Sequence, residues 1–240
     1  MLLSRSAGLL LACIAIANCG RAPRDPLRQF PRLMLWAWER PEDLRFLDPR
    51  HAGVASLAET VFIDARGVRL RPRLQPLRIA AGTRLMAVVR IEAESPAEVQ
   101  VNAAADLIAG AARQPDVGAL QLDYDARRSE RPFYRQLAVA VRRRMPRAMP
   151  LTMTALVSWC VSDPWIGGLP VTDAVPMYFR MGPEPRLRSA ALRSPLCQAS
   201  TGLSTDELLR VPLHGRIFLF SPRRWTPQAV ARAVAEVNRW

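Results

Sequence analysis

The sequence contains no lysine: all 34 basic residues are arginine, and with 21 acidic residues they give a formal net charge of +13. Such a charge is common among proteins that bind nucleic acid or acidic surfaces. Proteins that bind phosphate usually combine lysine with arginine, whereas arginine alone beside abundant alanine and proline is typical of a GC-rich codon bias. We therefore interpret the arginines mainly as a solvated surface and predict no nucleic-acid partner.

Residue patterns that hold metals or nucleotides are also lacking. The two histidines, His51 and His214, are far apart in the sequence, and no Cys-x-x-Cys or His-x-x-x-His spacing occurs. Gly167-Gly168 is only a short turn, and neither a GxGxxG nor a Walker motif is present. The sequence therefore predicts no metal and no cofactor.

Long apolar runs are absent after the first twenty residues, and residues 1–19 resemble an export signal. Arg5 supplies a positive charge, and Ala7 to Ala17 is apolar but too short to span a bilayer. Ile16-Ala17-Asn18-Cys19 resembles a lipobox, although Asn18 stands where a small residue is usual. We predict a periplasmic lipoprotein anchored to the membrane through Cys19. Cleavage after Ala15-Ile16-Ala17, which would release a protein beginning at Asn18, and an uncleaved anchor are the alternatives.

Cysteine is scarce in the remainder of the chain, where only Cys160 and Cys197 occur. Two cysteines in an oxidising compartment are candidates for one disulfide. That disulfide would close a loop of about 37 residues and stabilise the fold by about 3–4 kcal/mol in the chain-entropy model. Two buried free thiols are the alternative.

The composition is otherwise that of a folded domain. Half of the 240 residues are hydrophobic, which is enough for a full core. Residues 20–31 are polar and punctuated by proline, so we expect a tether there and a single domain over residues 32–240. That domain contains eight short, nearly continuous apolar runs, the pattern of parallel strands buried on both faces: 33–38, 53–58, 85–91, 119–124, 151–157, 174–179, 199–204 and 216–220.

Helix-like segments separate several of these runs, notably 96–112, 130–145 and 226–240. The alternation predicts an α/β fold, a TIM-like (β/α)₈ barrel. Because the connections after the fifth to seventh runs are thin and rich in proline, we expect an irregular barrel. Residues 61–70 predict a β-hairpin excursion after the second strand. An open doubly wound sheet is the alternative fold.

In a TIM-like barrel the chemistry lies at the carboxyl ends of the strands. Asp123 and Asp125 end the fourth run, and strand alternation places both on one face. Two close carboxylates raise the pKa of one of them, which suits a general acid. The alternative is that one aspartate caps the following helix or pairs with Arg127 or Arg128.

Other carboxylates and several tryptophans also follow predicted strands. A pair of carboxylates can cleave a glycosidic bond, and tryptophan faces stack on sugars. We predict Glu207 or Glu39 as the second catalytic carboxylate. The predicted substrate-binding residues are Trp36, Trp38, Glu92, Trp159, Arg180 and Asp206. The tryptophans could instead pack in the core, Glu92 could pair with Arg90, and Asp206-Glu207 could begin a helix.

Seven segments carry a resemblance to a known family: Leu35–Leu44, Ala87–Glu92, Leu120–Arg127, Ser129–Arg131, Leu156–Cys160, Val175–Gly182 and Gly202–Glu207. Together they resemble the bacterial family known as domain of unknown function 3142. The resemblance implies an exported protein with a TIM-barrel-like domain and carries no assigned activity.

A second resemblance is to the strand-four motif of chitinase-like glycosidases, in which aspartates alternate and a glutamate ends the strand. Asp125 stands where the family has that glutamate, and Asp123 stands at the aspartate before it. Gln121 stands where the family has the next aspartate upstream. This resemblance implies an acid role for Asp125, with a side chain one methylene shorter than the family's.

Together these observations predict an exported barrel that binds carbohydrate and cleaves a glycosidic bond, with Asp125 as the acid and Asp123 tuning it. A non-catalytic envelope lipoprotein that binds a glycan or another partner is the alternative. A third reading is a partner-binding protein whose arginine surface meets anionic lipid or polysaccharide.

Overall fold

The computed structural model describes residues 25–181, 185–207 and 210–239. The predicted export signal and Cys19 lie outside these residues. No helix within the described ranges is long and apolar enough to cross a membrane.

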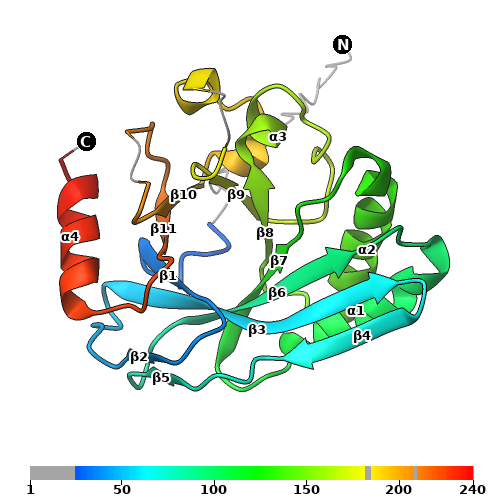
Figure 1. Cartoon of the computed structure of the whole chain (residues 1–240), viewed down its shortest axis with the longest axis horizontal. Coiled ribbons are helices and arrows are strands. Elements are labelled where there is room, and N and C mark those ends of the chain that lie inside the picture. The colour runs from blue at the N-terminus through cyan, green and yellow to red at the C-terminus, as the bar shows by residue number, and fades with distance from the viewer. Residues whose placement is uncertain (1–24, 182–184, 208–209, 240) are drawn as a thin grey trace, which may run out of the picture.

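Eight parallel strands form a closed barrel, in the order β1-β3-β6-β7-β8-β9-β10-β11 (Figure 1). The barrel closes because β1 pairs with both β3 and β11, which excludes the open doubly wound sheet. The TIM-like fold is thus confirmed. The strands are β1 (Leu33–Ala37), β3 (Ala52–Asp64), β6 (Leu85–Ala93), β7 (Val117–Asp123), β8 (Leu151–Leu156), β9 (Asp173–Met177), β10 (Ser200–Ser204) and β11 (Arg216–Phe220).

The helices around the barrel are uneven. Two full helices, α1 (Val101–Ala111) and α2 (Arg131–Arg144), follow β6 and β7, and α4 (Pro227–Val237) follows β11. Thr226 caps α4 by accepting a hydrogen bond from the Ala229 N–H, with a proline at the first helical turn. After β8 to β10 the described residues form only the short α3 (Val157–Val161) and the 3₁₀ turns η3 (Pro185–Arg188) and η4 (Pro195–Cys197), as the proline-rich connections predict.

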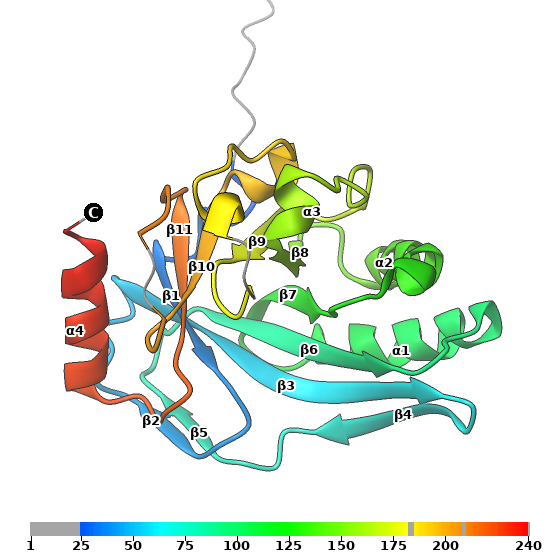
Figure 2. The same cartoon turned by 45° about the horizontal axis from the view of Figure 1, so that its top comes forward.

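The predicted hairpin is an outgrowth of the second barrel strand itself. β3 runs for 13 residues and then pairs antiparallel with β4 (Gly67–Pro72), across a turn whose Gly67 has a φ of 116°. Figure 2 shows this hairpin extending away from the rest of the barrel, with α1 alongside. A register shift between Leu57 and Glu59 marks an irregularity in the pairing of β3 with β6. The extension therefore builds a wall beyond the carboxyl end of the barrel. A separate two-stranded sheet joins β2 (Glu42–Leu44) to β5 (Leu77–Ile79).

Residues 25–31, which the sequence analysis assigned to a tether, pack against the amino-terminal end of the barrel. Leu27 and Phe30 are buried in one cluster with Met34 and other interior side chains. The Arg216 guanidinium donates to the carbonyls of Leu27, Phe30 and Pro31. Two apolar side chains and one buried arginine thus hold residues 25–31 in place as a plug that covers the amino-terminal end of the barrel. The rest of the predicted tether, residues 20–24, lies outside the described residues.

The disulfide predicted between Cys160 and Cys197 is present, with Cα atoms 5.9 Å apart. It joins α3 to η4, and both cysteines are fully buried. This crosslink holds together the part of the barrel wall where full helices are replaced by short turns.

Candidate functional site

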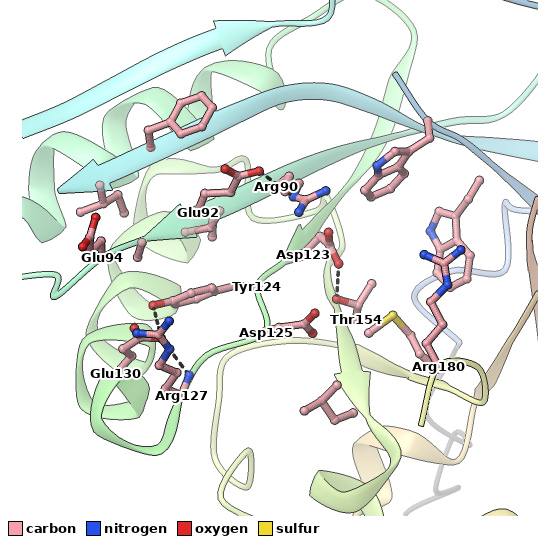
Figure 3. A pocket seen from close by; sticks show the side chains of 18 of the residues that line it. Arg90, Glu92, Glu94, Asp123, Tyr124, Asp125, Arg127, Glu130, Thr154 and Arg180 are labelled. Atoms are coloured by element: carbon pink, nitrogen blue, oxygen red, sulfur yellow. Dashed lines mark hydrogen bonds and ion pairs between the residues drawn. The ribbon is translucent and has the colours of Figure 1, made fainter. Parts of the chain in front are cut away.

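A cavity of about 640 Å³ opens at the carboxyl ends of the strands (Figure 3). Every barrel strand except β10 contributes a described lining residue. The extension of β3 and β6 adds Phe62, Glu92 and Glu94 to one side. The cavity therefore lies where TIM-like barrels carry their chemistry.

Asp123, the last residue of β7, projects into this cavity (Figure 3). Its Oδ1 accepts a hydrogen bond of 2.8 Å from the Thr154 hydroxyl on β8. The pKa of Asp123 is raised to about 6, chiefly by burial and also by the nearby Asp125 charge, although the Thr154 hydrogen bond and the Arg90 charge oppose the rise. Near neutral pH this carboxyl therefore exchanges between its acid and its ionised form.

Asp125 lies two residues further on and also lines the cavity. Its side chain is exposed to the cavity opening, and partial burial still raises its pKa, against the pull of Arg90. No hydrogen bond joins its carboxylate to another described side chain. The structure thus brings Asp123 and Asp125 to one cavity, with Asp125 near enough for its charge to raise the pKa of Asp123.

Glu130, rather than either aspartate, serves the turn that leads into α2. Its Oε2 accepts hydrogen bonds from the Arg127 backbone N–H at 2.8 Å and from the Tyr124 hydroxyl at 3.0 Å. Glu130 is buried and was not among the candidates from the sequence, although a glutamate three residues after Arg127 has the spacing of a capping residue. Because Glu130 does this work, Asp125 is left free to face the cavity.

An aromatic wall stands on the other side of the cavity. Trp38 and Phe220 meet edge to face at 6.2 Å, and Phe179 stacks on Phe220 at 5.7 Å. Trp36 lies at the bottom of the cavity: it is only 2% exposed, and its indole N–H donates to Gln121 Oε1 at 2.8 Å. Trp38 is therefore the tryptophan that offers an open face, and the two phenylalanines are wall residues that the sequence analysis missed.

Arg180 reaches the cavity from the loop after β9. Its backbone is left-handed, with a φ of 53°, and its guanidinium lies 5.5 Å from the Phe220 ring centroid. The Arg180 backbone N–H donates to Glu207 Oε2 at 2.9 Å. Glu207 thus fixes the loop that carries Arg180, and it is not among the lining residues of the cavity.

Three other predicted residues also lie away from the cavity lining. Glu39 binds the Arg71 guanidinium at 2.9 Å, and Asp206 accepts a hydrogen bond from the Ser204 hydroxyl. Trp159 is 2% exposed and packs edge to face on Trp165 at 5.0 Å, because it lies on α3 and faces the core. Glu39 thus serves a salt bridge, Asp206 a turn and Trp159 the core.

The wall opposite the aromatic residues carries charge from β6. Glu92 lines the cavity and pairs with Arg90 at 3.1 Å. Arg90 on β6 pairs with Asp123 on β7 in the strand register. Glu92 lies two residues after Arg90 and therefore on the same face of the sheet. Glu92 on β6 and Asp125, two residues after the neighbouring β7, therefore lie at the same end of the barrel.

Within the described ranges, no group of three or more His, Cys, Asp or Glu side chains is arranged to hold a metal ion. Comparison of this chain with protein-family models, with curated proteins and with solved structures gives no match.

Proposed function

We propose that this protein binds a carbohydrate in the cavity and hydrolyses a glycosidic bond there. One observation carries the proposal: two carboxyl groups with raised pKa values face an aromatic wall across a cavity of about 640 Å³. Aromatic faces accept the C–H surface of a sugar ring, while carboxyl groups bind its hydroxyls and transfer protons. The cavity is large enough for a few sugar units.

Asp125 is the proposed general acid. Its side chain reaches the open part of the cavity, and partial burial raises its pKa, which favours the protonated form that a general acid needs. Asp123 lies deeper, fixed by Thr154, and the charge of Asp125 raises its pKa. This gives Asp123 a tuning role, since protonation of one member of a close pair favours ionisation of the other.

Glu92 is the proposed second carboxylate. Glu207 and Glu39 are engaged elsewhere, by Arg180 and Arg71 respectively. Glu92 lines the same cavity as Asp125, and Arg90 orients it. In this position it would serve as the base that activates water or as the nucleophile, according to its separation from Asp125 in the complex.

The test is sugar release from a panel of α- and β-linked oligosaccharides and envelope glycans, with binding measured in parallel. Asp125→Asn and Glu92→Gln should each lower turnover at least a hundredfold while glycan binding is kept. Asp206→Asn, a carboxylate outside the cavity, is the matched control and should leave turnover within twofold. Turnover that survives in Asp125→Asn would refute the assignment.

A non-catalytic glycan-binding protein is the second candidate. The shorter Asp125 side chain, in the place where the chitinase-like motif has a glutamate, favours it. In that case glycans bind to the unmodified protein and to Asp125→Asn with equal affinity, and neither releases sugar.

We also propose that the chain is exported and anchored as a periplasmic lipoprotein through Cys19. The Cys160–Cys197 disulfide supports an oxidising compartment. Metabolic labelling with an alkyne fatty acid should mark the unmodified protein and not Cys19→Ala. Label retained in that variant would refute lipidation at this cysteine.

A further inference from the structure

The amino-terminal end of the barrel carries a surplus of positive charge. The described segments that lead into the barrel strands contain eight arginines and three aspartates, within residues 25–32, 45–51, 80–84, 112–116, 145–150, 168–172, 198–199 and 210–215. At the cavity end, acidic residues such as Glu94, Asp125 and Glu207 accompany the arginines. The amino-terminal end, on the side away from the cavity, therefore carries a surplus of five positive charges, eight arginines less three aspartates.

Five exposed arginines of this end form what we call the basic floor: Arg28, Arg32, Arg84, Arg113 and Arg147. None of the five makes an ion pair with another described residue, while Arg45 and Arg50 at the same end pair with Asp43 and Asp48. The five guanidinium groups are therefore available to an anionic surface.

The plug fixes where the rest of the chain leaves the barrel. Residues 25–31 are held across the amino-terminal end by Leu27, Phe30 and Arg216, so Asp25 lies at the basic floor. Only five residues separate Asp25 from Cys19, and the apolar run Ala7–Ala17 lies directly before that. Six residue steps reach at most about 20 Å.

We propose that the basic floor docks on an anionic phospholipid surface. The short reach from the apolar amino-terminal segment and the charge of the floor both point to a bilayer as the partner. An arginine close to an anionic bilayer strengthens binding about fivefold, and the effect falls off within a Debye length of about 10 Å. Docking in this orientation directs the cavity mouth away from the membrane, toward substrates in the surrounding space. The inference does not depend on the reaction proposed for the cavity.

The experiment uses a chain that begins at Gly20, because the barrel, the plug and the disulfide all lie within residues 25–239. Its folding is checked by cooperative thermal unfolding. Binding is measured by co-sedimentation with vesicles of phosphatidylcholine alone and of phosphatidylcholine with one third phosphatidylglycerol. We expect binding only to the anionic vesicles, and weaker binding as salt is raised.

The deciding comparison is between two triple charge reversals. Arg84→Glu with Arg113→Glu and Arg147→Glu reverses three floor charges and should weaken binding to anionic vesicles at least a hundredfold. The matched control reverses Arg66, Arg128 and Arg223, which are exposed at the opposite end, and should change binding less than threefold. Equal losses in the two variants, or no binding of the unmodified chain to anionic vesicles, would overturn the proposal.

Discussion

Asp123→Asn should make the protein more stable at alkaline pH while it impairs the cavity. The pKa of Asp123 rises from the ordinary 3.8 to about 6 on folding, chiefly through burial. The folded protein therefore holds this proton more tightly than the unfolded chain does. The stability that this tighter proton binding contributes is fully present below pH 3.8, declines as pH rises toward 6 and is absent above it.

The size of the effect follows from the same two pKa values. At 1.36 kcal/mol per pH unit, ionised Asp123 costs the fold about 3 kcal/mol relative to the protonated form. Asparagine carries no charge and keeps an oxygen for the Thr154 hydroxyl. Since Asp123 is partly open to the cavity, solvent screening reduces the gain. We expect the free energy of unfolding at pH 8 to rise by about 1–3 kcal/mol.

Urea unfolding followed by tryptophan fluorescence at pH 4 and pH 8 measures this gain. The difference between the variant and the unmodified protein should be large at pH 8 and small at pH 4. The variant should also lose turnover in the glycan assay, if the cavity acts as proposed. A variant that is no more stable at pH 8 than at pH 4, relative to the unmodified protein, would refute the reasoning on burial.

Three further predictions use the same unfolding measurement. Glu59→Gln should stabilise the fold at pH 8 by about 2–3 kcal/mol and have little effect at pH 4, because burial raises the pKa of Glu59 to about 7; equal effects at both pH values would contradict this. Phe30→Ala should cost about 3–5 kcal/mol, because Phe30 is buried in the plug, whereas a mere tether would give a change near zero. Cys197→Ser should cost about 2–4 kcal/mol through loss of the disulfide, and the unmodified protein under reducing conditions should lose a similar amount.

The barrel was predictable because its strands are nearly continuous apolar runs between polar or proline-rich breaks. Both faces of such a strand are buried, so the whole run shows in the sequence. The run 216–220 coincides with β11, and the others end within a few residues of the observed strands, except 53–58. That strand continues to Asp64 with a register shift near Ala58, which depends on the pairing with β6.

The plug was not predictable, because its two buried side chains are scattered among polar residues. Leu27 and Phe30 are separated by Arg28 and Gln29, which are exposed. Only the open end of a closed barrel gives these two side chains an apolar place to pack. Local composition therefore indicated a linker where tertiary packing produced order.

The candidate site was predicted only as far as strand alternation extends. Strand alternation predicted that Asp123 and Asp125 would share one face, and both line the cavity, with Asp123 at the end of β7 and Asp125 two residues beyond it. Glu39 and Asp206 each lie two residues past a strand, where the chain has turned and the side chain finds a local partner. Trp159 follows β8 as part of a helix, so its direction is set by a period of 3.6 residues rather than 2.

Three buried carboxyl groups can be compared to ask which of them has a role in the cavity. Glu59, Asp123 and Asp173 all have pKa values raised to about 6 or 7 by burial, so each destabilises the fold when ionised. Asp173 faces Ser200 at the plugged end, and Glu59 does not line the cavity. Asp123 alone of the three combines this cost with access to the cavity. A cost of this kind is typical of catalytic residues. Neutral amide variants of the three residues should therefore behave differently. All three should be more stable than the unmodified protein at pH 8, and only Asp123→Asn should lose turnover in the glycan assay.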